Sequence, residues 1–261
     1  MGLERSEGLP GATMDSELLQ QAHYDQIGKA YDSHYGDPFS KKYRVRFFYE
    51  PMFEGIELSG MNVLEAMCGS GQTVEYLIEK GSKVTGLDIS AVEINAFRRN
   101  WPECNAVCGS MLDSGFEDES FDCVNVVGGL HHMHPNLNEA IQEIHRILKP
   151  GGYFCFTEPH SGSAADAIRQ VWYRYDKLFA ANEAAVDVKE LKNEFSSQFK
   201  FTKETYMGNI AYLLVFNSMV FRIPVRLKFV YSDLVMGIES LINRLPGKLF
   251  SCFVVAQWQK K

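Results

Sequence analysis

The apolar and polar positions change their period twice between residues 62 and 90. An apolar run from Asn62 to Ala66 ends in a glycine-rich turn, and apolar residues then recur at helical spacing from Val74 to Ile78. A second apolar run, Lys83 to Leu87, follows and ends at Asp88. The order strand, tight turn, helix and strand predicts half of a nucleotide-binding βαβ unit.

The same alternation continues toward residue 160. Asn105 to Met111 is predicted to form a third short strand with its exit loop, Phe121 to Val127 a fourth strand, and Tyr153 to Thr157 a fifth. Strands that alternate with helices favour an α/β domain with a parallel sheet. In such a sheet, ligands bind beyond the carboxyl ends of the strands.

Capping residues predict where two of the helices begin. Ser90 followed by Glu93 forms a capping box, and this helix is expected to run to about Asn100. Asn136 with Glu139 predicts the same arrangement for the helix that precedes the fifth strand.

The C-terminal part of the chain has a less regular pattern. We expect helices over Ala164–Asn182 and Asp187–Gln198, a sixth strand over Lys200–Tyr206, and a last strand over Phe250–Trp258. Between the last two strands lies a helical insertion, residues 209–248.

The insertion is predicted to contain two helices. Residues 210–223 are apolar on nearly all sides, and apolar residues from Leu227 to Leu245 recur three and four positions apart. Four polar residues lie off that stripe: Lys228, Asp233, Glu239 and Arg244. These helices must bury their apolar surface against the domain itself or a substrate tail, a second subunit, or a membrane surface.

Length and composition indicate one large core with embellishments. The chain has 261 residues, 46% of them hydrophobic, and its net charge of −7 argues against broad attraction to nucleic acid. The stretch Phe39 to Phe53 interleaves basic and aromatic residues, but in an acidic chain we interpret it as a solvated helix face. No signal peptide and no apolar run of about 18 residues is present, so we expect no transmembrane segment.

The six cysteines also bear on the compartment. They are scattered without a Cys-x-x-Cys pair, so we expect reduced thiols in a cytoplasmic protein. We divide the chain into a disordered extension or cloning remnant (1–14), an N-terminal helical cap (15–60), a cofactor-binding core (61–160) and a C-terminal half (161–261).

The glycine turn and its two flanking acids indicate the kind of cofactor. Gly69 and Gly71 allow a ligand to approach the backbone closely, and Asp88 lies near the offset at which an acid meets ribose hydroxyls. A dinucleotide site would need a third glycine where Val74 stands, and Glu65 would repel a pyrophosphate. A ligand with no phosphate and a cationic amino-acid end is therefore favoured.

Residues 62–90 resemble motif I and the following acidic position of class I S-adenosylmethionine-dependent methyltransferases. The family pattern is acid-x-Gly-x-Gly-x-Gly, and Met67 stands here at the first glycine. The segment Leu130-His131-His132 resembles the family's fourth-strand exit, and Leu148 to Gly152 its most recognisable turn. Tyr24 to Asp32 is similar to the segment that folds over the cofactor, so the resemblance runs continuously from Tyr24 to Glu158.

This resemblance implies a fold, a cofactor and a site. It implies a Rossmann-like, seven-stranded, mostly parallel sheet with helices on both faces and an antiparallel last strand, binding S-adenosyl-L-methionine. The cofactor-binding residues it implies are Tyr24, Tyr31, Glu65, Ala66, Gly69, Gly71, Asp88, Ile89, Ser110, Met111 and Gly128. Tyr24 and Tyr31 are alternatively ordinary core aromatics, and Ser110 part of a plain loop.

The catalytic candidates are two histidines and a glutamate. A hydroxyl acceptor must lose its proton, and a histidine with a pKa near 6.5 is suited to accept it. We predict His131 as the base and His132 as the second choice, with Glu158 orienting the imidazole. Alternatively His132 bonds a loop carbonyl and His131 merely lines the pocket. His134 is expected to be exposed, and no metal is expected, because no Asp or Cys cluster accompanies the histidines.

The acceptor is expected to be a small molecule methylated on oxygen, with an apolar molecule as one option. The Asn/Asp-Pro-Pro-aromatic loop of amino-methylating nucleic-acid enzymes and the Pro-Cys pair of cytosine enzymes do not occur. Two other classes remain open: a non-catalytic S-adenosylmethionine-binding partner protein, and an NAD(P)-dependent oxidoreductase. A homodimer could form through the insertion.

Overall fold

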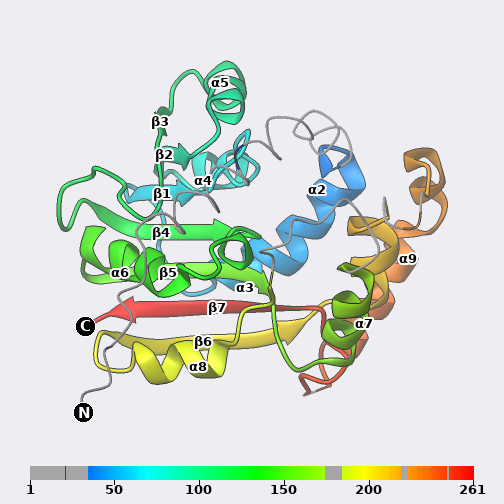
Figure 1. Cartoon of the computed structure of the whole chain (residues 1–261). Helices are drawn as coiled ribbons and strands as arrows, with labels where there is room; N and C mark the ends of the chain where they lie inside the picture. Colours follow the sequence, from blue (N-terminus) through cyan, green and yellow to red (C-terminus); the bar gives the residue numbers. More distant parts are fainter. Residues whose placement is uncertain (1–20, 22–34, 174–183, 219–220, 222, 246) are drawn as a thin grey trace, which may run out of the picture.

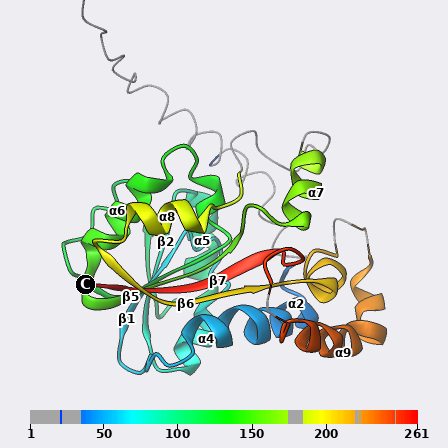
Figure 2. The same cartoon turned by 90° about the horizontal axis from the view of Figure 1, so that it is seen from below.

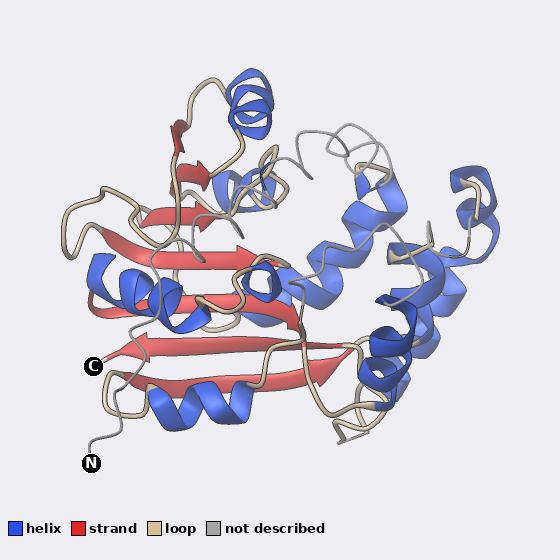
Figure 3. Cartoon of the chain, in the orientation of Figure 1, coloured by secondary structure: helices blue, strands red, loops and turns tan. Residues whose placement is uncertain are grey.

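A computed structural model of the chain describes residues 21, 35–173, 184–218, 221, 223–245 and 247–261. Seven strands form one sheet: β1 (Asn62–Ala66), β2 (Lys83–Asp88), β3 (Asn105–Cys108), β4 (Phe121–Val127), β5 (Leu148–Pro159), β6 (Phe199–Met207) and β7 (Phe253–Lys260). Their order is β3-β2-β1-β4-β5-β7-β6, and β7 is antiparallel to both of its neighbours (Figure 3). The predicted fold class is confirmed.

Helices cover both faces of this sheet (Figures 1 and 2). They are α2 (Pro38–Arg44), the π-helix η1 (Val45–Tyr49), α3 (Glu50–Phe53), α4 (Val74–Glu79), α5 (Ala91–Asn100), the 3-10 turn η2 (Leu130–His132), α6 (Leu137–Ile147), α7 (Ala164–Tyr173), α8 (Val188–Glu194), the π-helix η3 (Tyr212–Phe216) and α9 (Val225–Ile242). Buried residues of α2 to α5 join one core cluster, and those of α6 and α8 join a second. The sheet separates two hydrophobic cores.

Helix capping follows the sequence at α5 but not at α6. The Ser90 hydroxyl accepts a hydrogen bond from the Glu93 backbone N–H at 3.2 Å, as predicted. Helix α6 begins directly after Asn136, but the Asn136 side chain makes no capping hydrogen bond, so the capping box expected there is wrong. The backbone of Asn136 has φ −94° and ψ 27°, outside the extended conformation typical of an N-cap.

Strand register brings four loops together at one edge of the sheet. Ala66 at the end of β1 is level with Leu87 in β2, and Val127 at the end of β4 is level with Thr157 in β5. Because these strands are parallel, their carboxyl ends share one edge. The residues that follow them, on which the site depends, therefore meet there.

Several boundaries in the C-terminal half differ from the prediction. Helix α8 stops at Glu194 rather than reaching Gln198, and β7 runs over Phe253–Lys260 rather than starting at Phe250. The predicted helix 164–182 is seen as α7 up to Tyr173, and the remainder lies outside the described residues. Of the expected helix 210–223, the structure shows the short π-helix η3 (Tyr212–Phe216), and residues 219, 220 and 222 lie outside the described part of the chain.

Helix α9 lies where the pattern predicts it but is turned the other way. Its fully buried residues include Lys228 and Glu239, while Leu234 and Leu241 on the apolar stripe are 70% and 61% exposed. Of the options for covering the stripe, burial within the domain itself is therefore wrong for most of its residues, although Val235 is buried. The stripe faces outward, and two charged residues face the protein.

Buried hydrogen bonds account for this orientation. The Lys228 ammonium donates to the Asp37 carboxylate at 2.7 Å and to the Ser40 hydroxyl at 3.0 Å, both in the α2 region. Glu239 accepts from the Tyr43 hydroxyl and from the backbone N–H groups of Ala211 and Tyr212. A charge held by several donors or acceptors can be buried, whereas an exposed leucine needs no partner. These bonds therefore fix which face of α9 points inward.

In the described part of the chain, no helix combines the length and hydrophobicity that crossing a membrane requires.

Candidate functional site

Glu65 occupies a buried position behind the glycine turn. It is 4% exposed, and its Oε1 accepts the Thr73 backbone N–H at 2.9 Å, while its Oε2 is buried without a hydrogen-bond partner. Burial raises the pKa of the Glu65 carboxyl to about 7, although Arg44 acts in the opposite direction. A carboxyl with one unused buried oxygen suits a cationic ligand group.

The two glycines of the turn are required for different reasons. Gly69 has φ +52°, a backbone conformation that favours glycine, and a Cβ there would meet only the Glu93 carboxylate, at an ordinary contact distance of 3.6 Å. Gly71 has φ +90°, and a Cβ there would lie 2.5 Å from the Trp101 indole nitrogen. The interpretation that a side chain at Gly71 would fill ligand space is therefore wrong. Packing against Trp101 excludes a side chain.

Met67 is accommodated at the family's first glycine position by a second glycine. Its backbone has φ +55°, which is uncommon for a residue with a side chain. A Cβ on Gly129 would lie 2.8 Å from the Met67 sulfur, so the side chain fits only because Gly129 has none. This contact also joins the turn after β1 to the histidine loop after β4.

Asp88 is held at the end of β2 by two backbone groups. Its Oδ2 accepts the Gly69 N–H at 2.8 Å, and its Oδ1 accepts the Ser90 N–H at 2.9 Å. Each carboxylate oxygen can accept a further hydrogen bond, so the group keeps acceptor capacity. The turn and Asp88 thus form one rigid unit.

The other predicted cofactor residues surround this unit unevenly. Ala66 and Met111 are buried in the core, Ile89 and Gly128 are half-buried, and the Ser110 hydroxyl accepts the Leu112 N–H at 2.9 Å. Tyr24 and Tyr31 lie outside the described residues. The structure therefore assembles the loops after β1, β2, β3 and β4 and leaves the two tyrosines unplaced.

His131 and Glu158 form the second half of the site. His131 Nδ1 lies 2.8 Å from Glu158 Oε2, and Glu158 itself is fully buried. Glu158 Oε1 also accepts the N–H groups of Gly129 and Leu130, both at 2.7 Å. A carboxylate that accepts from Nδ1–H leaves the lone pair on Nε2. The His131 side chain is 13% exposed, so most of the ring is buried and part of it remains accessible.

His132 and His134 complete the loop. The rings of His131 and His132 lie 3.8 Å apart between centroids, at 40°. His134 is half-buried rather than exposed, and burial, with the neighbouring His131, lowers the pKa of its imidazole. Among the described contacts, the His131 ring is the imidazole that lies within hydrogen-bond distance of Glu158.

Arg44 is a site residue that the sequence pattern does not reveal. The pattern of 39–53 predicts a solvated face, yet Arg44 is 3% exposed and donates to the Gln72 side chain at 2.9 Å. The Tyr49 hydroxyl donates to the Gln72 carbonyl, so the inner side of this stretch packs on the glycine turn. Lys41, Lys42 and Arg46 are exposed as predicted, and Arg44 is the exception. Alternation of exposed Lys41 and Lys42 with buried aromatics was the available signal.

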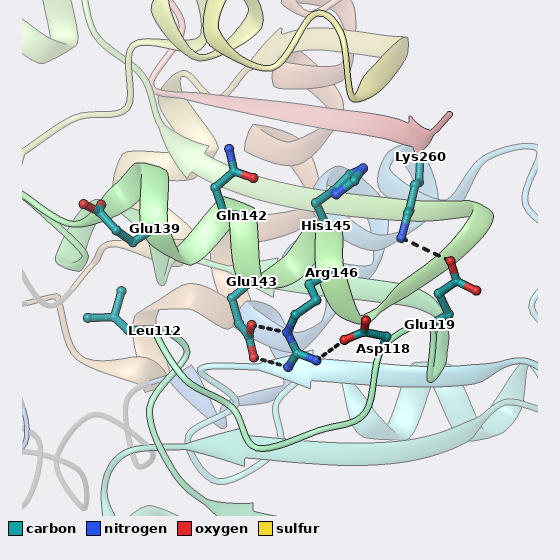
Figure 4. A pocket seen from close by; sticks show the side chains of 9 residues that line it. All are labelled: Leu112, Asp118, Glu119, Glu139, Gln142, Glu143, His145, Arg146 and Lys260. Atoms are coloured by element: carbon teal, nitrogen blue, oxygen red, sulfur yellow. Dashed lines mark hydrogen bonds and ion pairs between the residues drawn. The ribbon is translucent and has the colours of Figure 1, made fainter.

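A groove at the opposite end of the sheet is not part of this site (Figure 4). It is lined by Leu112, Asp118, Glu119, Glu139, Gln142, Glu143, His145, Arg146 and Lys260. Arg146 pairs with Glu143 at 2.7 Å and with Asp118 at 2.6 Å, and it holds the pKa of Glu143 down at about 2. These charges are already engaged with one another, and none of the predicted site residues lines the groove.

The fold and the loops at its carboxyl edge define a Rossmann-like domain that binds a nucleoside cofactor. Residues 64–156 match the family model described as a methyltransferase domain. The core of the chain, residues 64–156, is therefore similar to methyltransferase domains.

Curated relatives match the same core. An uncharacterised methyltransferase of Synechocystis sp. is 36% identical over 44% of this chain and 56% of its own length. The fatty-acid O-methyltransferase of Mycolicibacterium smegmatis is 33% identical over 45% of this chain and 43% of its own. The phthiotriol/phenolphthiotriol dimycocerosates methyltransferase 1 of Mycobacterium ulcerans is 38% identical over 40% of this chain and 39% of its own length. The chain thus spans about half the length, or less, of these relatives.

Solved structures agree on the fold. An S-adenosylmethionine-dependent methyltransferase from Archaeoglobus fulgidus has a TM-score of 0.59 at 21% identity, over 89% of this chain and 98% of that one. The [4+2]-cyclase SpnF has a TM-score of 0.62 at 15% identity, over 92% of this chain and 95% of that one. One fold thus carries proteins named for different reactions, so the reaction must be argued from the site.

Proposed function

We propose that this chain transfers a methyl group from S-adenosylmethionine to a hydroxyl oxygen of a small, apolar acceptor. The observation that carries the proposal is the His131–Glu158 pair at the carboxyl ends of β4 and β5. An oriented imidazole with an available Nε2 is suited to accept the proton of a hydroxyl acceptor. A protein that only binds the cofactor would not require this pair.

The residues after β1 and β2 fit the methyl donor. Glu65, with its unused buried oxygen, would face the ammonium group of S-adenosylmethionine. Buried Arg44 would supply a cation for the carboxylate of S-adenosylmethionine. Asp88 would accept from the ribose hydroxyls. Bound there, the cofactor supplies an activated methyl group on a sulfonium, and the protein aligns the acceptor with it and excludes water.

We expect Asp88→Ala to weaken S-adenosylmethionine binding by about 1–3 kcal/mol, or roughly 5- to 150-fold, the range for losing hydrogen bonds to a charged group. Isothermal titration calorimetry would measure the change. Glu57→Ala, which removes an exposed acid before the amino end of β1, provides the control. Unchanged affinity in Asp88→Ala would contradict the ribose assignment.

The apolar nature of the acceptor is supported by the relatives. One is named for fatty acids and an O-methyl transfer, the other for phthiotriol and phenolphthiotriol dimycocerosates. A hydroxyl acceptor must lose a proton on methylation, whereas an ionised carboxylate has none to lose. The His131–Glu158 pair therefore favours a hydroxyl over a carboxylate for this chain.

A labelled-methyl assay tests the proposal. The wild-type chain would be incubated with methyl-labelled donor and matched long-chain alcohols, phenols, amines and fatty acids. We expect label to enter the organic phase as a methyl ether. Label found only on amines or carboxylates would contradict the hydroxyl assignment, and no transfer to any component of a native metabolite extract would contradict catalysis.

A further inference from the structure

The outward face of α9 carries a continuous apolar stripe. Its residues recur three or four positions apart, so they lie on one side of the helix. Each is at least 39% exposed, and together they are Leu227, Val230, Leu234, Ile238, Leu241 and Leu245. Phe229, 82% exposed, lies on another side of the helix, and Leu249 and Phe250, which follow the helix in the chain, are also exposed. Contiguous exposed apolar surface of this kind marks an interaction site.

The stripe cannot be buried by rotating the helix. Lys228 and Glu239 anchor the opposite face through Asp37, Ser40 and Tyr43. Turning the stripe inward would pull these two charges away from their buried partners and leave the partners unpaired, which is strongly destabilising. The stripe is therefore held outward, where another molecule can cover it.

The charges beside the stripe indicate the chemistry of that molecule. Arg226 and Arg244 are exposed, and among the described residues neither has an ion pair. The one exposed acid of the helix, Asp233, is neutralised by Lys42 at 2.7 Å. In a chain with a net charge of −7, this face thus has an excess of cations.

We propose that the outward face of α9 docks on an anionic phospholipid bilayer, with the apolar stripe in the interface and the cations at the headgroups. Apolar residues on one side of a helix with basic residues alongside are the pattern of helices that lie in a bilayer surface. Each basic residue near an anionic surface adds about 1 kcal/mol of attraction.

A second copy of the chain fits this face less well. When two α9 helices pair in antiparallel orientation through their stripes, the residues along one side of the stripe in one copy lie opposite the same residues of the other copy, in reverse order. Arg226 of one copy would then lie near Arg244 of the other, and like charges in register repel. The cations therefore favour a negatively charged surface.

The position of α9 connects docking with the site. Figures 1 and 2 both place α9 near α2, beyond the carboxyl ends of β4 and β5. This is the edge of the sheet where the glycine turn and His131 lie. A chain docked through α9 thus holds that edge toward the bilayer. The docking proposal does not rest on the proposed reaction, because it needs neither donor nor acceptor.

Vesicle flotation with the full chain tests the proposal. The vesicles would contain phosphatidylcholine alone, or phosphatidylcholine with about one third phosphatidylglycerol, an anionic lipid. We expect the wild type to float with the anionic vesicles, to bind neutral vesicles at least tenfold more weakly, and to dissociate as salt is raised. Leu234→Gln/Leu241→Gln and Arg226→Gln/Arg244→Gln should each lower binding about tenfold or more, equivalent to about 1.4 kcal/mol.

Matched controls lie on α5, at the far edge of the sheet (Figure 1). Val92→Gln removes an exposed apolar residue there, and Arg99→Gln removes an exposed cation; both should leave flotation unchanged. No flotation of the wild type, or equal flotation of all variants, would overturn the proposal. So would light scattering that shows a dimer dissociated by Leu234→Gln/Leu241→Gln without vesicle binding, since the face would then join two copies.

Discussion

His131→Gln is expected to lower kcat about 10²- to 10⁴-fold for a hydroxyl acceptor, the usual contribution of a positioned base. Glutamine retains a donor toward Glu158, so the buried carboxylate keeps its hydrogen bond, but it offers no basic nitrogen to the acceptor. The affinity for S-adenosylmethionine should change little. Single-turnover kinetics with labelled donor would measure the methyl-transfer step directly.

His132→Gln is the matched control for this variant. It lies one residue away in the same 3-10 turn, and the described contacts of Glu158 are with His131, Gly129 and Leu130, so we expect a much smaller loss of kcat. Glu158→Gln should fall between the two, because its carbonyl still accepts the loop N–H groups while the negative charge is lost. Retention of full kcat by His131→Gln would show that His131 only lines the pocket.

The affinity for S-adenosylmethionine is expected to fall as the pH falls below about 7, by up to tenfold per unit. The pKa of Glu65 is raised to about 7 in the free protein, so the carboxyl takes up a proton below that pH. The ammonium group of the donor favours the ionised form, so binding at lower pH must displace this proton. Calorimetry in buffers of different ionisation enthalpy would detect the proton released.

Glu65→Gln provides the control for that pH dependence. It should weaken binding above pH ~7 and remove most of the pH slope, since glutamine carries no titratable group. The same substitution should stabilise the free protein. A carboxyl whose folded pKa is about 7 against 4.5 loses stability as the pH rises between these values, by about 3 kcal/mol, and glutamine does not. An unaltered pH slope in the variant would contradict the assignment of Glu65.

The core of the fold could be predicted because its signals are local. The strands β1 to β4 and helices α4 and α5 each depend on a short pattern, and Ser90 caps α5 locally. The meeting of the glycine turn, Asp88 and His131 then follows from parallel topology. Local patterns could not show why position 71 must be glycine. A Cβ there would clash with Trp101, which lies at the end of α5.

The orientation of α9 could not be predicted for the same reason. Its stripe, taken alone, indicates a helix whose leucines face inward. Lys228 and Glu239 are buried because they form hydrogen bonds with Asp37 and Tyr43. These partners lie 191 and 196 residues earlier in the chain, so a local pattern does not reveal them. Buried Arg44 was missed similarly, since its partner lies in the glycine turn. Apolar periodicity finds a helix, but distant polar partners decide which face is inside.

The central claim is that the turn after β1 holds S-adenosylmethionine and no pyrophosphate. Its most direct test is parallel calorimetric titration of the wild-type chain with S-adenosylmethionine, its demethylated product, NAD and NADP. We expect the first two to bind with dissociation constants on the order of micromolar, about −8 kcal/mol, and the dinucleotides not to bind. Binding of NAD or NADP in place of the methyl donor would contradict the account.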